Sequence, residues 1–324
     1  MSIRFNPSRR GVLIGSALAI AASTVPVDVS LAEIPDRDLA VNKKPILHPE
    51  GRAFGCYDPY GDFASDKPVV TEHLFLPWED VDLTGLPAAD TYARERGRKV
   101  LVTIEPWSWA KDWNLTNARL RRRVLAGEYD ENMRAICEVL ATFKSPITIR
   151  WAQEMENTSG RFSWQDWAPS AYIKAYRHMG DIARSLIPGV KLMWSPKGEK
   201  NLRDYYPGND YVDVVGLSVF GLEDYDKKVY GAPRTFAESV KQGYDLTVGY
   251  GKPIWVAELG YEGSLPYLER WVSDVTKPDG LFPQLKEVVY FNDKEVWEWP
   301  YQLGLPDWRV IRNKQVYPAR KSRA

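Results

Sequence analysis

Eight short apolar segments, separated by stretches with helical periodicity, constrain the fold of this chain more than any other feature. The segments cover residues 53–57, 73–77, 99–104, 147–151, 190–194, 212–218, 253–257 and 287–291. Several are rich in β-branched residues and are bounded by Gly or Pro, which is typical of buried parallel strands. Between them the spacing of apolar residues predicts amphipathic helices, including residues 86–96, 130–143 and 172–186.

Strands that alternate with helices indicate βα units and a parallel sheet. Because eight such strands fall within about 240 residues, we expect an α/β fold of the (β/α)8 barrel type. An open doubly wound sheet is the alternative, but no GxGxxG motif follows the first strand. No internal repeat or linker is evident, so residues 33–324 are predicted to form one domain.

The first 32 residues have the pattern of an export signal. Paired arginines at positions 9 and 10 precede an apolar stretch over residues 12–27, and Ser30 and Ala32 offer a cleavage site. The arginine pair predicts twin-arginine export, and therefore a periplasmic or secreted bacterial protein without stable membrane insertion after processing. An uncleaved N-terminal anchor is the alternative.

The composition excludes several classes of partner. The chain has 43 basic and 43 acidic residues, and a neutral chain lacks the basic surface of a nucleic-acid-binding protein. The three histidines lie far apart and no HExxH or CxxC motif occurs, so we predict no metal site and no cofactor. Cys56 and Cys137 are predicted to be buried thiols rather than a disulfide. We also expect a monomer.

Glutamates follow two of the predicted strands at the end where a barrel carries its chemistry. Glu154 follows the fourth strand and Glu258 ends the seventh, while Glu105 and Asp58 end the third and first. A single glutamate at a strand end is most often paired with an arginine. Two of them across a barrel mouth suit glycoside hydrolysis, in which one carboxyl protonates the leaving oxygen and the other attacks the anomeric carbon.

An excess of aromatic residues predicts a sugar-binding cleft, because flat rings stack on the apolar faces of pyranose units. The chain has 13 Trp and 18 Tyr. Tryptophans at or after strand ends are the predicted cleft walls, with packing of about half of them between barrel and helices as the alternative: Trp107, Trp109, Trp113, Trp164, Trp167, Trp194 and Trp297. Trp151 and Trp255 alternate with site-facing positions, so they are expected to pack between barrel and helices. Arg150 is expected either to order a carboxylate or to form a structural ion pair.

Two segments together resemble glycoside hydrolase family 26 of clan A. They are IRWAQEMEN at residues 149–157 and PIWVAELG at residues 253–260, and the likeness extends over residues 45–305. The resemblance implies that Glu154 is the acid/base and Glu258 the nucleophile of a retaining, endo-acting hydrolase of β-linked polysaccharide. It points first to β-1,4-mannan, with β-1,3/1,4-glucan or an exopolysaccharide as the alternatives.

Two residues depart from the pattern that the resemblance implies. Gln153 stands where family 26 has His and the clan has Asn, and its amide is expected to donate to a sugar hydroxyl. Phe220 stands where a Tyr usually donates to the nucleophile, a role that Tyr225 or Tyr230 would have to take over. We expect Gln153, Phe220 and Tyr225 to contact the substrate. A carbohydrate-binding barrel with weakened catalysis therefore remains an alternative, whereas an unrelated barrel such as an isomerase lacks its Gly-rich phosphate loop here.

Overall fold

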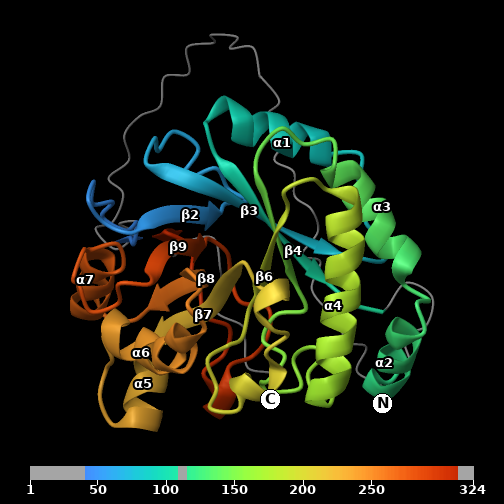
Figure 1. The fold of residues 1–324 in the computed structure, drawn as a ribbon. Coiled ribbons are helices and arrows are strands. Elements are labelled where there is room, and N and C mark those ends of the chain that lie inside the picture. Colours follow the sequence, from blue (N-terminus) through green and yellow to red (C-terminus); the bar gives the residue numbers. More distant parts are fainter. Residues whose placement is uncertain (1–40, 109–114, 313–324) are drawn as a thin grey trace, which may run out of the picture.

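The computed structural model describes residues 41–108 and 115–312, and its centre is a closed barrel of eight parallel strands (Figure 1). In barrel order the strands are β2 (Ala53–Tyr57), β3 (Val69–Pro77), β4 (Lys99–Glu105), β5 (Ile147–Trp151), β6 (Lys191–Trp194), β7 (Val214–Leu222), β8 (Ile254–Glu262) and β9 (Leu285–Phe291). Strand β9 pairs with β2 and closes the barrel. The predicted (β/α)8 fold is thereby confirmed.

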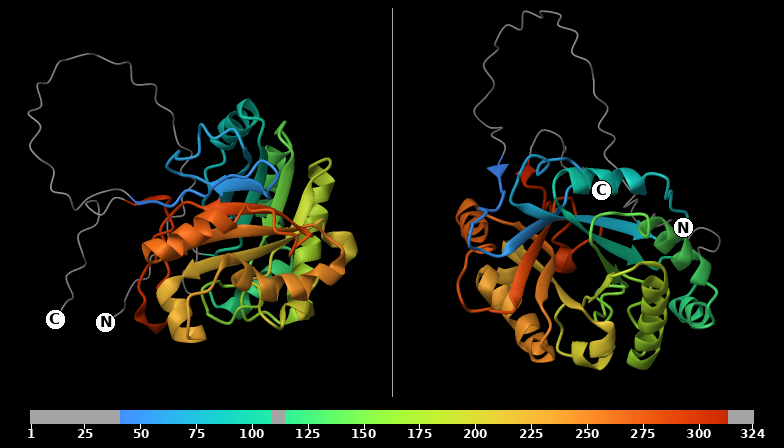
Figure 2. Two further views of the ribbon diagram at one scale, coloured as in Figure 1. Left: turned by 90° about the vertical axis from the view of Figure 1, so that its left-hand side faces the viewer. Right: turned by 45° about the horizontal axis from the view of Figure 1, so that its top comes forward.

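Seven α-helices in the described part surround the barrel, with α1, α3 and α4 on one side and α6 and α7 on the other (Figures 1 and 2). Their bounds are α1 (Leu86–Glu95), α2 (Asn117–Leu125), α3 (Asp130–Leu140), α4 (Pro169–Leu186), α5 (Glu223–Tyr230), α6 (Phe236–Thr247) and α7 (Leu265–Asp274). The three helices predicted from periodicity are α1, α3 and α4. Outside the barrel, β1 (Val41–Asn42) and β10 (Ile311–Arg312) form a small antiparallel sheet.

The main core lies between the barrel and its helices. Trp151 of β5 belongs to it and packs against aromatic rings of the loop after β5 and of α4: Trp167, Tyr172 and Tyr176. The predicted position of Trp151 between barrel and helices is therefore confirmed. Cys56 and Cys137 are both free and buried, as expected.

A second cluster fills the barrel interior, and Trp255 belongs to it. Its members come from five strands and can meet only inside the barrel: Leu101, Met193, Val214, Trp255, Ala257 and Val289. The expectation that Trp255 packs against the helices is therefore wrong. It assumed strict alternation along a strand that carries a bulge.

The predicted leader lies outside the described residues, and so does the location that it implies. Among the residues that the structure does describe, none of the helices has the length and apolar character needed to cross a membrane.

Candidate active site

Glu258 faces the barrel interior because β8 contains a β-bulge. Three residue steps on β8 match two on β9, as the register partners show: Val256 with Val288 and Leu259 with Tyr290. Without the bulge, Glu258 and Trp255 would lie on opposite faces of the strand, since they are three positions apart. The extra residue brings both to the inner face. The carboxylate of Glu258 is thereby withdrawn from water, and the residue is 4% exposed.

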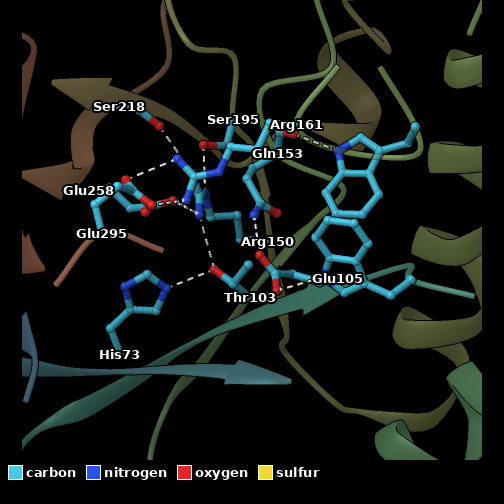
Figure 3. Close-up of polar contacts among 12 residues, drawn as sticks. His73, Thr103, Glu105, Arg150, Gln153, Arg161, Ser195, Ser218, Glu258 and Glu295 are labelled. Carbon is cyan, nitrogen blue, oxygen red and sulfur yellow. Dashed lines mark hydrogen bonds and ion pairs between the residues drawn. The ribbon is translucent and has the colours of Figure 1, made fainter. Parts of the chain in front are cut away.

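Arg150 of β5 holds Glu258 from across the barrel (Figure 3). Its Nη1 donates to Oε1 of Glu258 at 2.6 Å, and the arginine is fully buried. The remaining guanidinium contacts are to hydroxyl oxygens: Nε to Ser195 at 2.7 Å, Nη1 to Thr103 at 3.3 Å and Nη2 to Ser218 at 3.3 Å. A buried ion pair is tolerated when its other polar atoms are also satisfied. The carboxylate that Arg150 orders is thus Glu258.

Glu154 follows β5 in a backbone conformation that side chains rarely adopt. Its φ is +55°, and Ala152 two positions earlier has φ +49°. Such angles persist only where the surroundings fix them. Here the N–H of Glu154 donates to the carbonyl of Ser195 at 2.8 Å, and the carbonyl of Glu154 accepts from Nε2 of Gln165 at 3.2 Å. Ser195 therefore supports both glutamates, because its hydroxyl also accepts from Arg150.

The side-chain amide of Gln153 has its nitrogen paired, so the oxygen rather than the expected donor is left without a partner in the described part of the chain. Its Nε2 donates to Oε1 of Glu105 at 2.7 Å, and the other oxygen of Glu105 accepts from Nε1 of Trp107 at 3.0 Å. The amide nitrogen is thus already committed. The Oε1 of Gln153 is buried and has no hydrogen-bond partner within the described residues. A hydroxyl that donates to this oxygen would satisfy it.

Glu156 is a buried carboxyl two residues beyond Glu154. Its Oε1 accepts from the backbone N–H groups of Gly198 at 2.8 Å and Glu199 at 3.2 Å. Burial raises the pKa of Glu156 to about 7, although these N–H groups oppose the shift, and the nearby charge of Glu154 adds to it. The group therefore titrates near neutral pH beside the predicted acid/base.

The tryptophans predicted as cleft walls differ widely in exposure. Trp107 is half-buried and lies edge-on against Trp164, with ring centroids 5.1 Å apart. Trp164, Trp167 and Trp194 are exposed by 1% or less, so none of the three offers a face to a sugar. For these three the expectation is corrected. Trp109 and Trp113 lie outside the described residues.

Each of the three buried indoles has a structural contact that explains its position. Trp164 donates from Nε1 to the carbonyl of Gln153 at 2.6 Å, and so supports the residue before Glu154. Trp167 packs beside Trp151 at 6.5 Å. Trp194 lies edge-on against Tyr206 at 5.1 Å. A position just after a strand thus places a ring near the mouth but does not decide which way it points.

Phe220, Tyr225 and Trp297 lie near the ends of β7 and β9. Phe220 packs on Trp308 with centroids 5.0 Å apart, and Tyr225 packs edge-on against Trp299 at 5.3 Å. Trp297 is 36% exposed. The β7 residue in register with Glu258 is Ser218 rather than Phe220. The polar contact from β7 to this site therefore comes from Ser218, through Arg150.

Sequence reasoning missed four residues that support the site. Ser195, Ser218 and Thr103 contact Arg150, and Nε2 of His73 lies 2.7 Å from Oγ1 of Thr103 (Figure 3). Isolated Ser, Thr and His residues in apolar strands carry no motif, so only the barrel geometry identifies them. Asp58 is structural, since its carboxylate accepts from N–H groups of the following loop. Within residues 41–108 and 115–312 no group of three or more His, Cys, Asp or Glu could hold a metal ion.

Comparison with known proteins agrees with the first of the two motif segments, residues 149–157. Residues 124–246 match the model of glycosyl hydrolase family 26. This segment includes Glu154 and Arg150 and ends before β8.

A β-1,3-xylanase from Alcaligenes sp. is 25% identical over 220 residues, which are 62% of this chain and 45% of that protein. A mannan endo-1,4-beta-mannosidase from Bifidobacterium adolescentis is 26% identical over 199 residues, which are 56% of this chain and 20% of that protein. The chain therefore spans less than half the length of either relative. The structure of a modular endo-beta-1,4-mannanase from Cellulomonas fimi superimposes with a TM-score of 0.59 at 15% identity, covering 75% of this chain and 65% of that one. This likeness shows the shared fold.

Proposed function

Because the chain is related to glycosyl hydrolase family 26, we propose that it hydrolyses a β-linked polysaccharide by a retaining mechanism, with no metal or cofactor. The observation that carries the proposal is the bulge on β8. It turns Glu258 into the barrel, where it pairs with Arg150 of β5, the strand that leads to Glu154. A barrel stabilised only by its core has no need of a buried carboxylate at a bulge.

In the first step, Glu258 attacks the anomeric carbon while the bond to the leaving oxygen breaks. Glu154 gives its proton to that oxygen, and a covalent glycosyl-enzyme remains. In the second step, Glu154 takes a proton from water, the water oxygen bonds to the anomeric carbon, and Glu258 leaves as a carboxylate. Arg150 compensates the negative charge of Glu258 in the free enzyme. This ion pair allows the attacking carboxylate to stay ionised although it is buried in the barrel.

Gln153 is proposed to orient the sugar unit at which cleavage occurs. Its amide is fixed by Glu105, and its buried Oε1 is left to accept from a sugar hydroxyl. A site with an unsatisfied acceptor discriminates against substrates that lack the matching donor, because the acceptor would then stay unpaired. Because the amide of Gln153 is fixed, we expect the enzyme to select a sugar by the position of its hydroxyl group rather than by its charge.

β-1,4-Mannan is the first candidate substrate, on the resemblance of both glutamate segments and on the mannosidase relative. β-1,3-Xylan is the second, because a relative that aligns with 62% of this chain, at 25% identity, is named a β-1,3-xylanase. Mixed-linkage glucan and an exopolysaccharide are the third and fourth candidate substrates. A barrel that binds carbohydrate without cleaving it is the competing function. We further propose a secreted or periplasmic monomer, on the predicted twin-arginine leader.

Product analysis on carob galactomannan, β-1,3-xylan, β-1,4-xylan, lichenan and curdlan tests the proposal. We expect new reducing ends from one of these polymers, with the β-anomer appearing first by NMR. Glu258→Gln is expected to abolish the reaction, and Glu154→Gln to lower kcat roughly 10²–10⁴-fold. Glu128→Gln, at an exposed ion pair with Arg123 that includes no residue of the candidate site, is the matched control.

Two results would overturn the proposal. If Glu258→Gln is as active as the wild type, Glu258 is not the nucleophile. If the α-anomer appears first, the mechanism is inverting rather than retaining. Binding of one polymer without any new reducing ends would favour the carbohydrate-binding function.

A further inference from the structure

An ion pair joins two loops at the rim of the barrel. Arg161 donates to both oxygens of Glu295, at 2.8 Å from Nη2 and 3.1 Å from Nη1 (Figure 3). The side chain of Glu295 is 2% exposed and that of Arg161 is 17% exposed. The N–H groups of Val296 and Trp297 also donate to Oε1 of Glu295, at 2.9 and 3.2 Å. This is a bidentate and largely buried pair rather than a loose surface contact.

The two loops follow strands on opposite sides of the barrel. Arg161 lies between β5 and α4, and Glu295 lies just beyond β9. In the closed order of eight strands, β5 and β9 are four positions apart in either direction. Both loops leave the carboxyl ends of their strands, so the ion pair spans the mouth above the catalytic residues.

The span divides the mouth between two groups of strands. Glu258 belongs to the side formed by β6, β7 and β8, whereas the half-buried Trp107 follows β4 on the other side. Glu154 and Glu258 are only 7% and 4% exposed beneath it. The bulge on β8 already withdraws Glu258 from water, and the ion pair in addition lies across the route between the two sides of the mouth.

We propose that the Arg161–Glu295 ion pair closes the cleft on one side and restricts the enzyme to the ends of polysaccharide chains. This inference rests on the proposed function, and it deepens it by assigning the mode of attack. A sugar unit seated at Glu258 lies on the side of β6, β7 and β8, and a chain that continued toward β4 would have to pass the ion pair, so we expect that an internal unit of a long chain does not fit. The endo action implied by the family resemblance is replaced here by release of short products from chain ends.

The first test needs no activity. In Arg161→Met, which keeps the length of the side chain and removes its charge, we expect hydrogen exchange to quicken at least fivefold in residues 293–299. Carbodiimide labelling of Glu154 and Glu258 in the same variant should also quicken at least fivefold. Arg52→Met is the matched control, because Arg52 pairs with Asp279 at 2.7 Å at the opposite end of the barrel. If hydrogen exchange and carbodiimide labelling are unchanged in Arg161→Met, the ion pair does not cover the two carboxylates and the proposal is refuted.

The second test uses whichever polymer the wild type cleaves best among the five named for product analysis. We expect the loss of viscosity per reducing end to rise at least threefold in Arg161→Met and in Glu295→Gln, with longer products. Arg161→Lys should fall between them and the wild type, because lysine keeps the charge without the bidentate geometry. An equal ratio in wild type and variants would overturn the proposal. If the wild type releases no reducing ends, the proposed function fails, and the exchange experiment still decides the role of the span.

Discussion

Replacing Glu156 by Gln should stabilise the protein at high pH and leave it unchanged at low pH. The pKa of Glu156 is raised to about 7 in the folded protein, chiefly by burial, from an ordinary value of 4.5. Between these values the folded state binds more protons than the unfolded state, so stability is highest below about pH 4.5 and falls as pH rises through 7. Above pH 8 the ionised carboxylate lowers the free energy of unfolding by about 3 kcal/mol.

Gln has the shape of the neutral carboxyl and keeps an oxygen for the N–H groups of Gly198 and Glu199. Urea unfolding of wild type and Glu156→Gln at pH 5, 6, 7 and 8 measures the difference in the free energy of unfolding. We expect a difference of about 1 kcal/mol at pH 5 that grows to about 3 kcal/mol in favour of the variant at pH 8. Taking the difference at each pH cancels the titration of every other group.

Glu138→Gln is the control, since Glu138 is exposed on α3 and keeps its hydration on folding. Its difference from wild type should stay flat with pH. The reasoning is refuted if Glu156→Gln also gives a flat difference. It is equally refuted if the variant loses stability at pH 8, which would mean that the two N–H groups outweigh the desolvation of the charge.

Three further substitutions test the packing and charge arguments. Arg150→Met should lower the free energy of unfolding by about 3–5 kcal/mol, because it leaves Glu258 buried without its cation, and adding Glu258→Gln should recover part of that loss in urea unfolding. Thr235→Ala removes the capping box of α6 and should cost about 1 kcal/mol by the same assay while leaving activity unchanged. Gly216→Ala places a Cβ 2.6 Å from the sulfur of Met193 inside the barrel, so thermal unfolding should show a loss of about 1–3 kcal/mol.

Periodicity was sufficient to predict the barrel, because each buried parallel strand is a continuous apolar run with turn residues at its ends. It did not give the length of β7 and β8, which continue to Leu222 and Glu262. The second halves of both strands, which lie nearer the barrel mouth, contain Gly and polar residues. Two of these residues, Ser218 and Glu258, belong to the candidate site.

The bulge on β8 shows why the face of Trp255 was predicted wrongly, whereas the prediction for Glu258 did not depend on alternation. Glu258 was found from its place at the strand end and from the motif around it, and neither depends on the face to which a side chain points. Trp255 was assigned by alternation, which a single inserted residue reverses. No local composition marks the bulge, since it is a property of three strands in register: β7, β8 and β9.

Two of the tryptophans that composition suggested for sugar stacking hold the residues around Gln153 through their N–H groups. Trp164 fixes the carbonyl of Gln153, and Trp107 fixes Glu105, which in turn holds the amide of Gln153. Two indoles thus set the residue before Glu154 through their N–H groups, while their rings fill the space behind it. A residue with a positive φ, such as Glu154, needs rigid surroundings, and a large ring with one donor provides them with few freely rotating bonds. Trp164 and Trp107 thus support the segment proposed to carry the acid/base, and among the described cleft-wall candidates Trp107 and Trp297 keep exposed surface for the proposed sugar stacking.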